Sequence, residues 1–266
     1  MNMKRALIIK QTLNVVRERK KWLQVCFMNW WYISDYRRLR KQRAESKSLD
    51  FPFGRNRPIL HERYSEAGTM SGGYFHQDLL VARKIFKANP HRHVDIGSLI
   101  ASFVAHVAVF REIEIFDIRK QENKVPNIIF RQADLMRLPD SMTHCCDSIS
   151  ALHSIEHFGL GRYGDPIDYF GHVKALKNIT QMLRPGGIFY FSAPLGKQRI
   201  EFNAHRVFSA SYLWNLLKED YDLLSFSYVD AAGCHENVAF TDQLTARFAK
   251  TRGYDLGIFE LRKKPD

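Results

Sequence analysis

The sequence predicts an α/β fold: a mainly parallel sheet of about seven strands with helices on both faces, preceded by a basic helical extension. Short apolar runs typical of strands alternate along the chain with amphipathic helical stretches, and this alternation is typical of a parallel sheet covered on both faces. Pro and Gly residues mark the boundaries between these runs. The 266 residues are enough for one large domain with an appendage.

The positive charge of the chain is concentrated near its N-terminus. Residues 1–50 contain 13 Lys and Arg against 4 acids, which accounts for most of the formal net charge of +12. Because the rest of the chain is nearly balanced, we expect no nucleic-acid-binding surface on it. The four cysteines form no CxxC pair, and we expect them to be reduced thiols of a cytoplasmic protein.

Residues 1–48 are predicted to form a basic amphipathic helical extension. Within it, residues 20–43 place Trp and aliphatic side chains between two Lys and a run of Arg and Lys, which suits the headgroup region of an anionic membrane surface. Packing of the apolar side on the main domain is at least as well supported by the same pattern, and contact with nucleic acid is a third interpretation. The longest apolar stretch, residues 22–33, is about half a membrane span, so we expect peripheral contact with the inner membrane surface rather than crossing.

The remaining elements follow in order along the chain. Residues 49–73 contain two Pro and four Gly without periodicity and are predicted to be a linker or lid. The domain of residues 74–266 begins with an amphipathic helix over 74–88. Further helices are predicted over 100–109, 168–183 and 209–218. Strands are predicted at 93–97, 112–118, 127–134, 147–152, 187–194, 223–230 and 254–263. The last two strands have no convincing helix between them, so we expect them to be antiparallel.

Three acids stand where predicted strands end. In an open α/β sheet the ligand binds at the carboxyl ends of the strands. Asp95 and Gly97 close the first strand, and Asp117 ends the second, 20 residues after Gly97, the distance at which an acid reaches a ribose hydroxyl. Asp134 ends the third strand, beside Leu135. Each acid alone is as well explained by chance, but three in phase favour a nucleotide-type cofactor site.

The succession DIG, FDIR, QADLMRLP, LHSIEH and LRPGGIFYFSAP resembles the motif series of class I S-adenosylmethionine-dependent methyltransferases over roughly residues 90–230. The resemblance implies a Rossmann-like fold and S-adenosylmethionine as cofactor. In that family the acid at the Asp117 position holds the ribose, the acid at the Asp134 position meets the adenine amino group, and the Gly-rich turn lies along the methionine part. The cofactor-binding residues implied are Asp95, Gly97, Ser98, Asp117, Asp134, Leu135 and His153.

More narrowly, DIGS, IEHFGLGRYGDPID and FNAHRVFS resemble a methyltransferase-like domain-of-unknown-function family found in bacterial surface-glycan gene clusters. This resemblance implies O-methylation of a sugar or glycolipid precursor in surface-polysaccharide biosynthesis. The turn departs from the GxGxG of most class I enzymes, since it reads Gly97-Ser98-Leu99-Ile100-Ala101, and a missing glycine leaves a Cβ where backbone approaches the ligand. A non-catalytic binding or scaffold protein in glycan assembly is therefore the alternative. The missing G-x-G-x-x-G counts against a nicotinamide-dependent sugar enzyme.

The stretch IEHFGLGRYGD (155–165) follows the fourth strand, where this fold places its substrate-facing loop. Methyl transfer to a hydroxyl requires removal of one proton, which a His or a carboxylate can accept. The candidate bases are, in order, His157, His205 and Asp165, and a structural role for His157 stays open. Arg side chains grip phosphate or carboxylate in a forked geometry, although they also occur as solvated surface charges. The candidate substrate-binding residues are Glu156, Arg162, Tyr163, Arg199 and Arg206.

His153, Glu156 and His157 also match the H-x-x-E-H pattern of some zinc peptidases. Zinc ligands at that spacing need to lie on one helical face. Here His153 closes an apolar strand-like run, and Gly159 and Gly161 interrupt any helix that follows. We therefore expect no metal at this motif.

Overall fold

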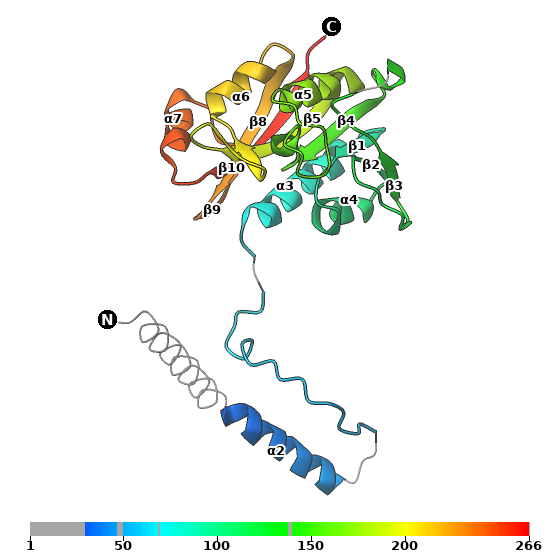
Figure 1. Cartoon of the computed structure of the whole chain (residues 1–266), viewed down its shortest axis with the longest axis vertical. Coiled ribbons are helices and arrows are strands. Elements are labelled where there is room, and N and C mark those ends of the chain that lie inside the picture. Colours follow the sequence, from blue (N-terminus) through cyan, green and yellow to red (C-terminus); the bar gives the residue numbers. More distant parts are fainter. Residues whose placement is uncertain (1–29, 47–49, 69, 138–139, 266) are drawn as a thin grey trace, which may run out of the picture. The chain divides into compact units, whose positions relative to one another are not determined.

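The computed structural model describes residues 30–46, 50–68, 70–137 and 140–265. The chain divides into two compact units, Met1–Thr69 and Met70–Asp266 (Figure 1). The division falls inside the segment 49–73 that the sequence predicts to be a linker or lid. The sheet and the candidate site both belong to the second unit.

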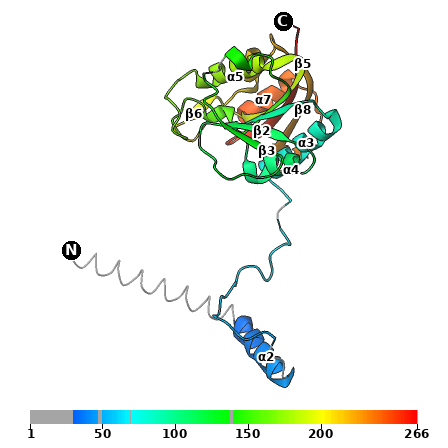
Figure 2. The same cartoon turned by 90° about the vertical axis from the view of Figure 1, so that its right-hand side faces the viewer.

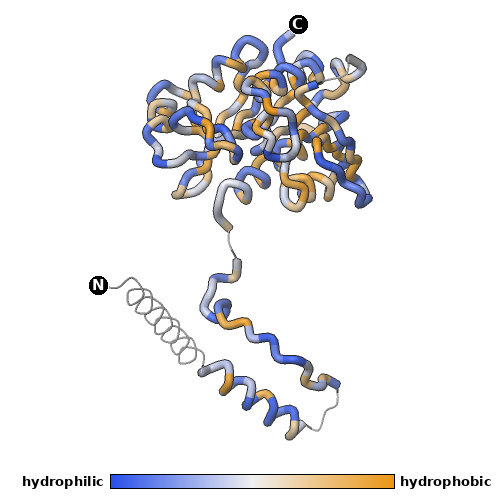
Figure 3. The backbone as a smooth tube through the Cα atoms, viewed as in Figure 1, coloured by the Kyte–Doolittle hydropathy of each residue, from blue (hydrophilic) through white to orange (hydrophobic). Residues whose placement is uncertain are grey.

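In the first unit, helix α2 (Trp30–Ser46) buries none of its residues. Hydrophilic and hydrophobic residues alternate along it (Figure 3). Residues 50–68 contact this helix through two aromatic contacts and an ion pair. Arg63 pairs with Asp35 at 2.5 Å and stacks on the ring of Trp31, and Phe53 meets the ring of Tyr36 edge-on. The rest of the predicted extension, residues 1–29 and 47–48, lies outside the described residues.

The described helices include none that is both long and apolar enough to cross a bilayer. The large apolar side chains of α2 are open to solvent, with Trp30 exposed to 68% and Leu39 to 55%. Contact of this segment with a membrane surface stays a prediction.

The second unit contains an eight-stranded sheet with the order β3-β2-β1-β4-β5-β10-β8-β9 (Figure 1). Its strands are β1 (His93–Ile96), β2 (Ile113–Asp117), β3 (Ile128–Gln132), β4 (Cys146–Leu152), β5 (Leu183–Leu195), β8 (Tyr221–Asp230), β9 (Gly233–His235) and β10 (Asp255–Lys263). Strands β1 to β5 are parallel, and β10 runs antiparallel to both β5 and β8. The predicted antiparallel pair at the end of the sheet is confirmed.

Helices cover both faces of the sheet, as the sequence predicts. Helix α3 (Gly73–Ala88), a π-helical turn (Ile100–Val104) and α4 (Ala105–Ala108) pack on one face. Helices α5 (Gly171–Met182), α6 (Ala210–Leu217) and α7 (Asp242–Lys250) pack on the other. Figure 2 shows α5 on the opposite side of β2 and β3 from α3 and α4. Because both faces of the sheet are covered, all of β1 and the first four residues of β2 are buried, including the polar residues among them.

The structure adds elements that the sequence patterns do not reveal. Helix α7 lies between β8 and β10, where the sequence predicts none, and Thr241 caps it by accepting a hydrogen bond from the Leu244 amide at 3.2 Å. Strands β6 (Arg199–Glu201) and β7 (His205–Val207) form a separate two-stranded sheet between β5 and α6. At three residues each, β6, β7 and β9 are too short for a period-two pattern to show.

The strand order with an antiparallel β10 between β5 and β8 is the Rossmann-like arrangement of the class I methyltransferase fold, and the predicted fold class is confirmed. The chain progresses outward from β1 through β2 to β3 and then crosses to β4 on the other side of β1. This reversal places the topological switch point between β1 and β4, and open α/β sheets bind ligands there.

Candidate functional site

A groove with two adjoining lobes lies at the carboxyl ends of β1 to β4. The inner lobe, about 510 Å³ of empty space, is lined by apolar side chains and by residues that follow β2 and β3. The wider outer lobe, about 1550 Å³ including its open mouth, extends over the residues after β1 and β4. Both lobes are lined by Gly97, Asp117, Arg119, His157 and Tyr163, so they form one continuous site.

Gly97 forms the turn at the end of β1. Its φ of +67° lies in the left-handed region, and an added Cβ would come within 3.3 Å of the Ser154 Cβ. The Gly97 amide donates to the Phe116 carbonyl at 3.0 Å, which fixes the turn to β2. This position therefore keeps the close backbone approach that the predicted ligand requires.

Asp95 lies beneath that turn and does not line either lobe. Its buried carboxylate accepts hydrogen bonds from the Ser98 amide (3.0 Å), the Ser98 hydroxyl (2.6 Å) and the Ser150 hydroxyl (2.6 Å). The Ser98 hydroxyl in turn accepts from the Leu152 amide at 3.0 Å. The prediction that Asp95 contacts the cofactor is thus corrected: all of its hydrogen bonds point into the protein, and it positions the turn.

Asp117 lines both lobes, as predicted, but a neighbour occupies its carboxylate. Arg119 donates to Asp117 from its amide (2.8 Å), Nε (2.9 Å) and Nη2 (2.6 Å). The same guanidinium stacks on the Tyr163 ring with 4.2 Å to the centroid. Arg119 was not among the predicted site residues, although it stands in the FDIR motif. A ligand hydroxyl that binds the Asp117 carboxylate therefore has to share its oxygens with the Arg119 side chain or displace that side chain.

Asp134 and Leu135 line the inner lobe, as predicted. The Met136 amide donates to Asp134 Oδ1 at 2.9 Å, and Leu135 is almost fully buried. Ser154, also in this lobe, has a buried hydroxyl with no hydrogen-bond partner among the described residues. An apolar slot whose lining includes Asp117, Asp134 and an unpartnered hydroxyl suits a nucleoside, whose flat base is apolar on its faces and polar at its edges.

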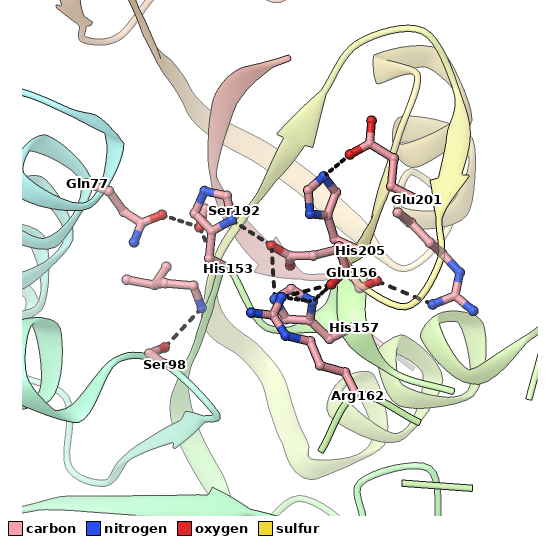
Figure 4. Close-up of polar contacts among 12 residues, drawn as sticks. Gln77, Ser98, His153, Glu156, His157, Arg162, Ser192, Glu201 and His205 are labelled. Atoms are coloured by element: carbon pink, nitrogen blue, oxygen red, sulfur yellow. Dashed lines mark hydrogen bonds and ion pairs between the residues drawn. The ribbon is translucent and has the colours of Figure 1, made fainter. Parts of the chain in front are cut away.

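The residues after β4 form a buried polar chain on the floor of the outer lobe (Figure 4). His153 has a positive φ of 51°, and its Nδ1 lies 2.6 Å from Glu156 Oε1. The same oxygen is 3.8 Å from His157 Nε2. His153 precedes the 3₁₀ turn Ile155–His157, so the H-x-x-E-H residues do not share a helical face. Among the described residues, no three His, Cys, Asp or Glu side chains are grouped so that they could hold a metal ion.

His157 has the orientation of a proton acceptor. Its Nδ1 is 2.7 Å from the Ala204 carbonyl, which can only accept, so Nδ1 carries the hydrogen and Nε2 keeps its lone pair. Burial lowers the pKa of His157, and the nearby Glu156 carboxylate partly opposes that effect. The imidazole is therefore neutral at physiological pH, the state that a general base requires.

His205 reaches the same groove from β7, as Figure 4 shows. Its ring centroid is 6.4 Å from that of His157. Its Nε2 lies 3.2 Å from Oε2 of Glu201, a half-exposed carboxylate. The structure thus brings both predicted histidine bases to one site.

Asp165 has a structural role. It accepts hydrogen bonds from the amides of Gly159 (2.8 Å), Gly161 (3.1 Å) and Tyr163 (3.2 Å). These bonds occupy both carboxylate oxygens and close the loop after β4. The prediction of Asp165 as a third candidate base is therefore corrected, although its side chain borders the inner lobe.

Of the three predicted substrate-binding arginines, only Arg162 lines the groove, where it donates to the Ala204 carbonyl at 2.9 Å. Arg199 lines neither lobe and pairs with Glu201 at 2.7 Å. Arg206 is buried and donates to the carbonyls of Phe158 (2.5 Å) and Tyr169 (3.1 Å). The substrate-binding predictions for Arg199 and Arg206 are corrected, because backbone carbonyls or a carboxylate already engage their guanidinium groups.

Two tyrosines of the outer lobe were not among the predicted site residues. Tyr74, at the start of α3, has its ring centroid 5.0 Å from that of His153. Tyr254, just before β10, lies 5.3 Å from His205 by the same measure. Neither stands in a recognisable motif, and the topology brings them to the site from opposite ends of the domain.

Fold and groove define an α/β protein of the class I methyltransferase fold with a histidine-lined site at its switch point. The family model DUF268, described as a Caenorhabditis protein of unknown function, matches residues 102–249. This match spans more than half of the chain, and the chain belongs to the DUF268 family. No curated protein matches it.

Several solved structures are similar to this chain. The YcgJ protein from Bacillus subtilis has 14% identity and a TM-score of 0.50, covering 72% of this chain and 99% of its own. At this identity the likeness shows the fold. The 1,6-didemethyltoxoflavin-N1-methyltransferase of Burkholderia thailandensis, with bound S-adenosylhomocysteine, has 16% identity, coverage of 71% and 80%, and a TM-score of 0.48. The N-methyltransferase NodS of Bradyrhizobium japonicum has 12% identity and a TM-score of 0.47, covering 72% of this chain and 88% of its own.

The buried Asp95 leads us to predict how the free energy of unfolding depends on pH. Burial raises its pKa to about 6 in the folded protein, above the value in the unfolded chain, despite three hydrogen bonds. Between about pH 4 and pH 6 the folded state therefore holds a proton that the unfolded state has lost, so this group makes stability fall as pH rises. Relative to Asp95→Asn, we expect the wild type to lose about 2–3 kcal/mol of unfolding free energy over that window.

Urea denaturation of both proteins at pH 4, 5, 6 and 7 measures this difference. Asp95→Asn also loses hydrogen bonds, which changes its free energy of unfolding by the same amount at every pH. The test is therefore how the difference in unfolding free energy between the two proteins changes with pH. A difference that stays constant across the window would show that Asp95 titrates normally.

Proposed function

We propose that this protein is an S-adenosylmethionine-dependent methyltransferase acting on an oxygen of a sugar or glycolipid precursor. The observation that carries the proposal is the continuity of the groove. The inner lobe, an apolar slot lined by Asp117 and Asp134, opens directly into the outer lobe, and His157 lines both. A nucleoside-bearing cofactor bound in the slot would lie beside a neutral imidazole. The motif series from DIG to LRPGGIFYFSAP supports the same activity by its resemblance to class I methyltransferases.

The residues present fit the cofactor. Gly97 keeps the turn open, Asp117 and Asp134 offer carboxylates to hydroxyl and amino groups, and Leu135 supplies an apolar wall. The buried Ser154 hydroxyl provides a polar atom that lacks a protein partner. When bound, S-adenosylmethionine supplies a methyl group on a positively charged sulfur.

His157 is the proposed general base. Its Nδ1–H is held by the Ala204 carbonyl, and its Nε2 accepts the proton of the acceptor hydroxyl as the oxygen gains the methyl group. His205 is the second candidate, because it lines the same lobe. Arg162 and the three tyrosines of the lobe bind and orient the acceptor, since aromatic rings pack against the apolar faces of sugars.

The first prediction for this function concerns cofactor binding. The wild type should bind S-adenosylhomocysteine in calorimetry, and Asp117→Ala should weaken binding by roughly 1.5–3 kcal/mol, because a charged hydrogen bond to the ligand is lost. Asp222→Ala, at an exposed acid of β8 outside the groove, is the matched control and should bind normally.

No binding by the wild type at millimolar S-adenosylhomocysteine contradicts the methyltransferase proposal. Binding without transfer to any acceptor favours the alternative, a non-catalytic binding or scaffold protein of glycan assembly. Tight binding of NADH instead would point to a nicotinamide-dependent sugar enzyme.

The second prediction separates the two histidines. Transfer of labelled methyl from S-adenosylmethionine to a panel of sugars, sugar nucleotides and lipid-linked sugars identifies an acceptor. On that acceptor His157→Ala should lose about 100-fold to 10,000-fold in rate, because the proton must leave without a base, and should bind S-adenosylhomocysteine almost normally.

The matching variant is His205→Ala. Full activity in His157→Ala together with loss of activity in His205→Ala would transfer the base assignment to His205. If both variants lose cofactor affinity and thermal stability together, the two histidines are structural and the proposed base is wrong.

We further propose that the first unit attaches the protein to an anionic membrane surface from the cytoplasmic side. Its support is the charge of residues 1–50 together with solvent-exposed Trp30, Ile33 and Leu39 on α2. Basic side chains attract anionic headgroups and exposed aromatic rings enter the interface. A glycolipid acceptor would lie at the same surface.

Co-sedimentation with vesicles tests this attachment. The full chain should pellet with vesicles containing anionic lipid, and less so as salt is raised, because the attraction is electrostatic. A full-length variant with Arg37, Arg38, Arg40 and Lys41 changed to Gln, and a chain lacking residues 1–48, should stay in solution. Equal pelleting of all three proteins would rule out attachment through this segment.

A further inference from the structure

Glu156 is a fully buried carboxylate enclosed by two histidines (Figure 4). Oxygen Oε1 lies 2.6 Å from His153 Nδ1 and 3.8 Å from His157 Nε2. Oxygen Oε2 is also buried and has no hydrogen-bond partner among the described residues. The proposed reaction uses His157 alone, so it gives no reason for a buried acid here.

A carboxylate buried in this way needs a compensating positive charge, because removal from water strongly penalises the ionised form. The nearby arginines do not contact its oxygens. Arg162 donates to the Ala204 carbonyl, and Arg206 donates to backbone carbonyls, including that of Glu156 at 3.4 Å. Among the described residues, the His153 imidazole is the group that hydrogen-bonds the carboxylate, and His157 adds a compensating charge only when its Nε2 is protonated.

His153 is held in place for this pairing. Its backbone amide donates to the Ser192 hydroxyl at 3.0 Å, and that hydroxyl donates to Gln77 Oε1 at 2.5 Å. The ring of Tyr74 packs against the imidazole. With backbone and ring both fixed, the Nδ1–H of His153 points at Glu156 Oε1.

His157 is arranged differently. Its Nδ1–H is committed to Ala204, so the nitrogen nearer Glu156 is the unprotonated Nε2. At 3.8 Å this nitrogen makes no hydrogen bond with Oε1. Once Nε2 takes up a proton, the imidazolium faces a carboxylate across a short, water-poor gap, and the attraction between them is strong.

We propose that Glu156 is a positioning residue for the base: it anchors His153 by a hydrogen bond and stabilises the imidazolium that His157 becomes when it accepts a proton. The inference rests on the proposed role of His157. It assigns the two histidines different tasks, with His153 as the fixed partner of the acid and His157 as the group that changes charge.

Other charged and titratable groups also face this cluster. Tyr74 from α3, Arg162 and Tyr163 from the loop after β4, His205 from β7 and Tyr254 before β10 line the same lobe. Arg162 and His153 work to lower the pKa of His157 in addition to burial, and Glu156 works to raise it. Burial works to raise the pKa of Glu156, but the charges of His153 and His157 and the hydrogen bond from His153 hold it below its usual value.

Histidine nitrogen NMR of the full chain tests the proposal without knowledge of the acceptor. The probes are the titration midpoint and tautomer of each ring in the wild type, Glu156→Gln and Glu201→Gln. We expect Glu156→Gln to lower the midpoint of His157 by on the order of one pH unit, since a neighbouring opposite charge is removed. The hydrogen-bonded Nδ1 proton of His153 should also lose its downfield position.

Glu201→Gln is the matched control, because Glu201 pairs with His205, which lines the groove, but is itself solvent-exposed and lines neither lobe. It should leave the His157 midpoint unchanged. If Glu156→Gln leaves that midpoint within about 0.2 pH units of the wild type, the proposal is overturned. Should Glu156→Gln fail to fold in thermal unfolding, Glu156→Asp keeps the charge and should keep the His157 midpoint near the wild-type value; a fall on the order of one pH unit in that variant would overturn the proposal.

Spectra with EDTA and with added Mg²⁺ or Zn²⁺ test a different role. Metal-dependent shifts of the His153 and His157 nitrogens that vanish in Glu156→Gln would make the carboxylate a metal ligand and would overturn the positioning role. Calorimetry with S-adenosylhomocysteine on the same wild-type sample is read independently. Its failure would contradict the methyltransferase proposal, whereas the histidine titrations alone decide the role of Glu156.

Discussion

The candidate site depends on the hydrogen bonds that tie the end of β1 to β4 through the buried Asp95. Its carboxylate accepts from Ser150 within β4 and from Ser98 in the turn after β1, and the Ser98 hydroxyl accepts from the Leu152 amide at the end of β4. The two strands on either side of the switch point are thereby held in register. The turn on the cofactor side and the histidines on the acceptor side are fixed to one another.

The same hydrogen bonds hold the start of the altered glycine turn in place. In a GxGxG turn the later glycines let backbone approach the ligand. Here the missing glycines fall at Leu99 and Ala101, which both line the outer lobe, whereas Ser98 occupies a variable position and turns its hydroxyl into the protein, where it both donates and accepts. The first glycine, Gly97, keeps its positive φ, so the turn retains its shape at the position closest to Ser154. The second glycine position holds Leu99, a half-exposed residue that lines the outer lobe.

Much of the site was predictable from the sequence because parallel strands end at one edge of a sheet. Asp117, Asp134 and His157 follow three strands whose order the apolar runs reveal, and all three line the groove. The antiparallel pair of β8 and β10 was predicted because no helix was expected between them, and the pairing is confirmed although α7 does connect them. Burial of β1 explains why Asp95, also at a strand end, points inward instead.

The sequence could not tell which polar side chains are already engaged by the protein itself. Asp165 and Arg206 bond to loop backbone whose path no local pattern reveals, and Arg119 pairs with Asp117 two residues away. Strands β6 and β7 are too short for a periodic signal, yet they place His205 opposite His157. Tyr74 and Tyr254 join the groove only through tertiary packing, because they lie far apart in the sequence.

The central claim is that the inner lobe is a nucleoside pocket that opens onto His157. A crystal structure of the full chain grown with S-adenosylhomocysteine tests it most directly. The account predicts density for the adenosine between Leu135 and Gly97, its ribose hydroxyls on Asp117, and the Arg119 side chain displaced from that carboxylate. A structure with the ligand bound elsewhere, or with the lobe empty and the Asp117–Arg119 pair intact at saturating ligand, would contradict it.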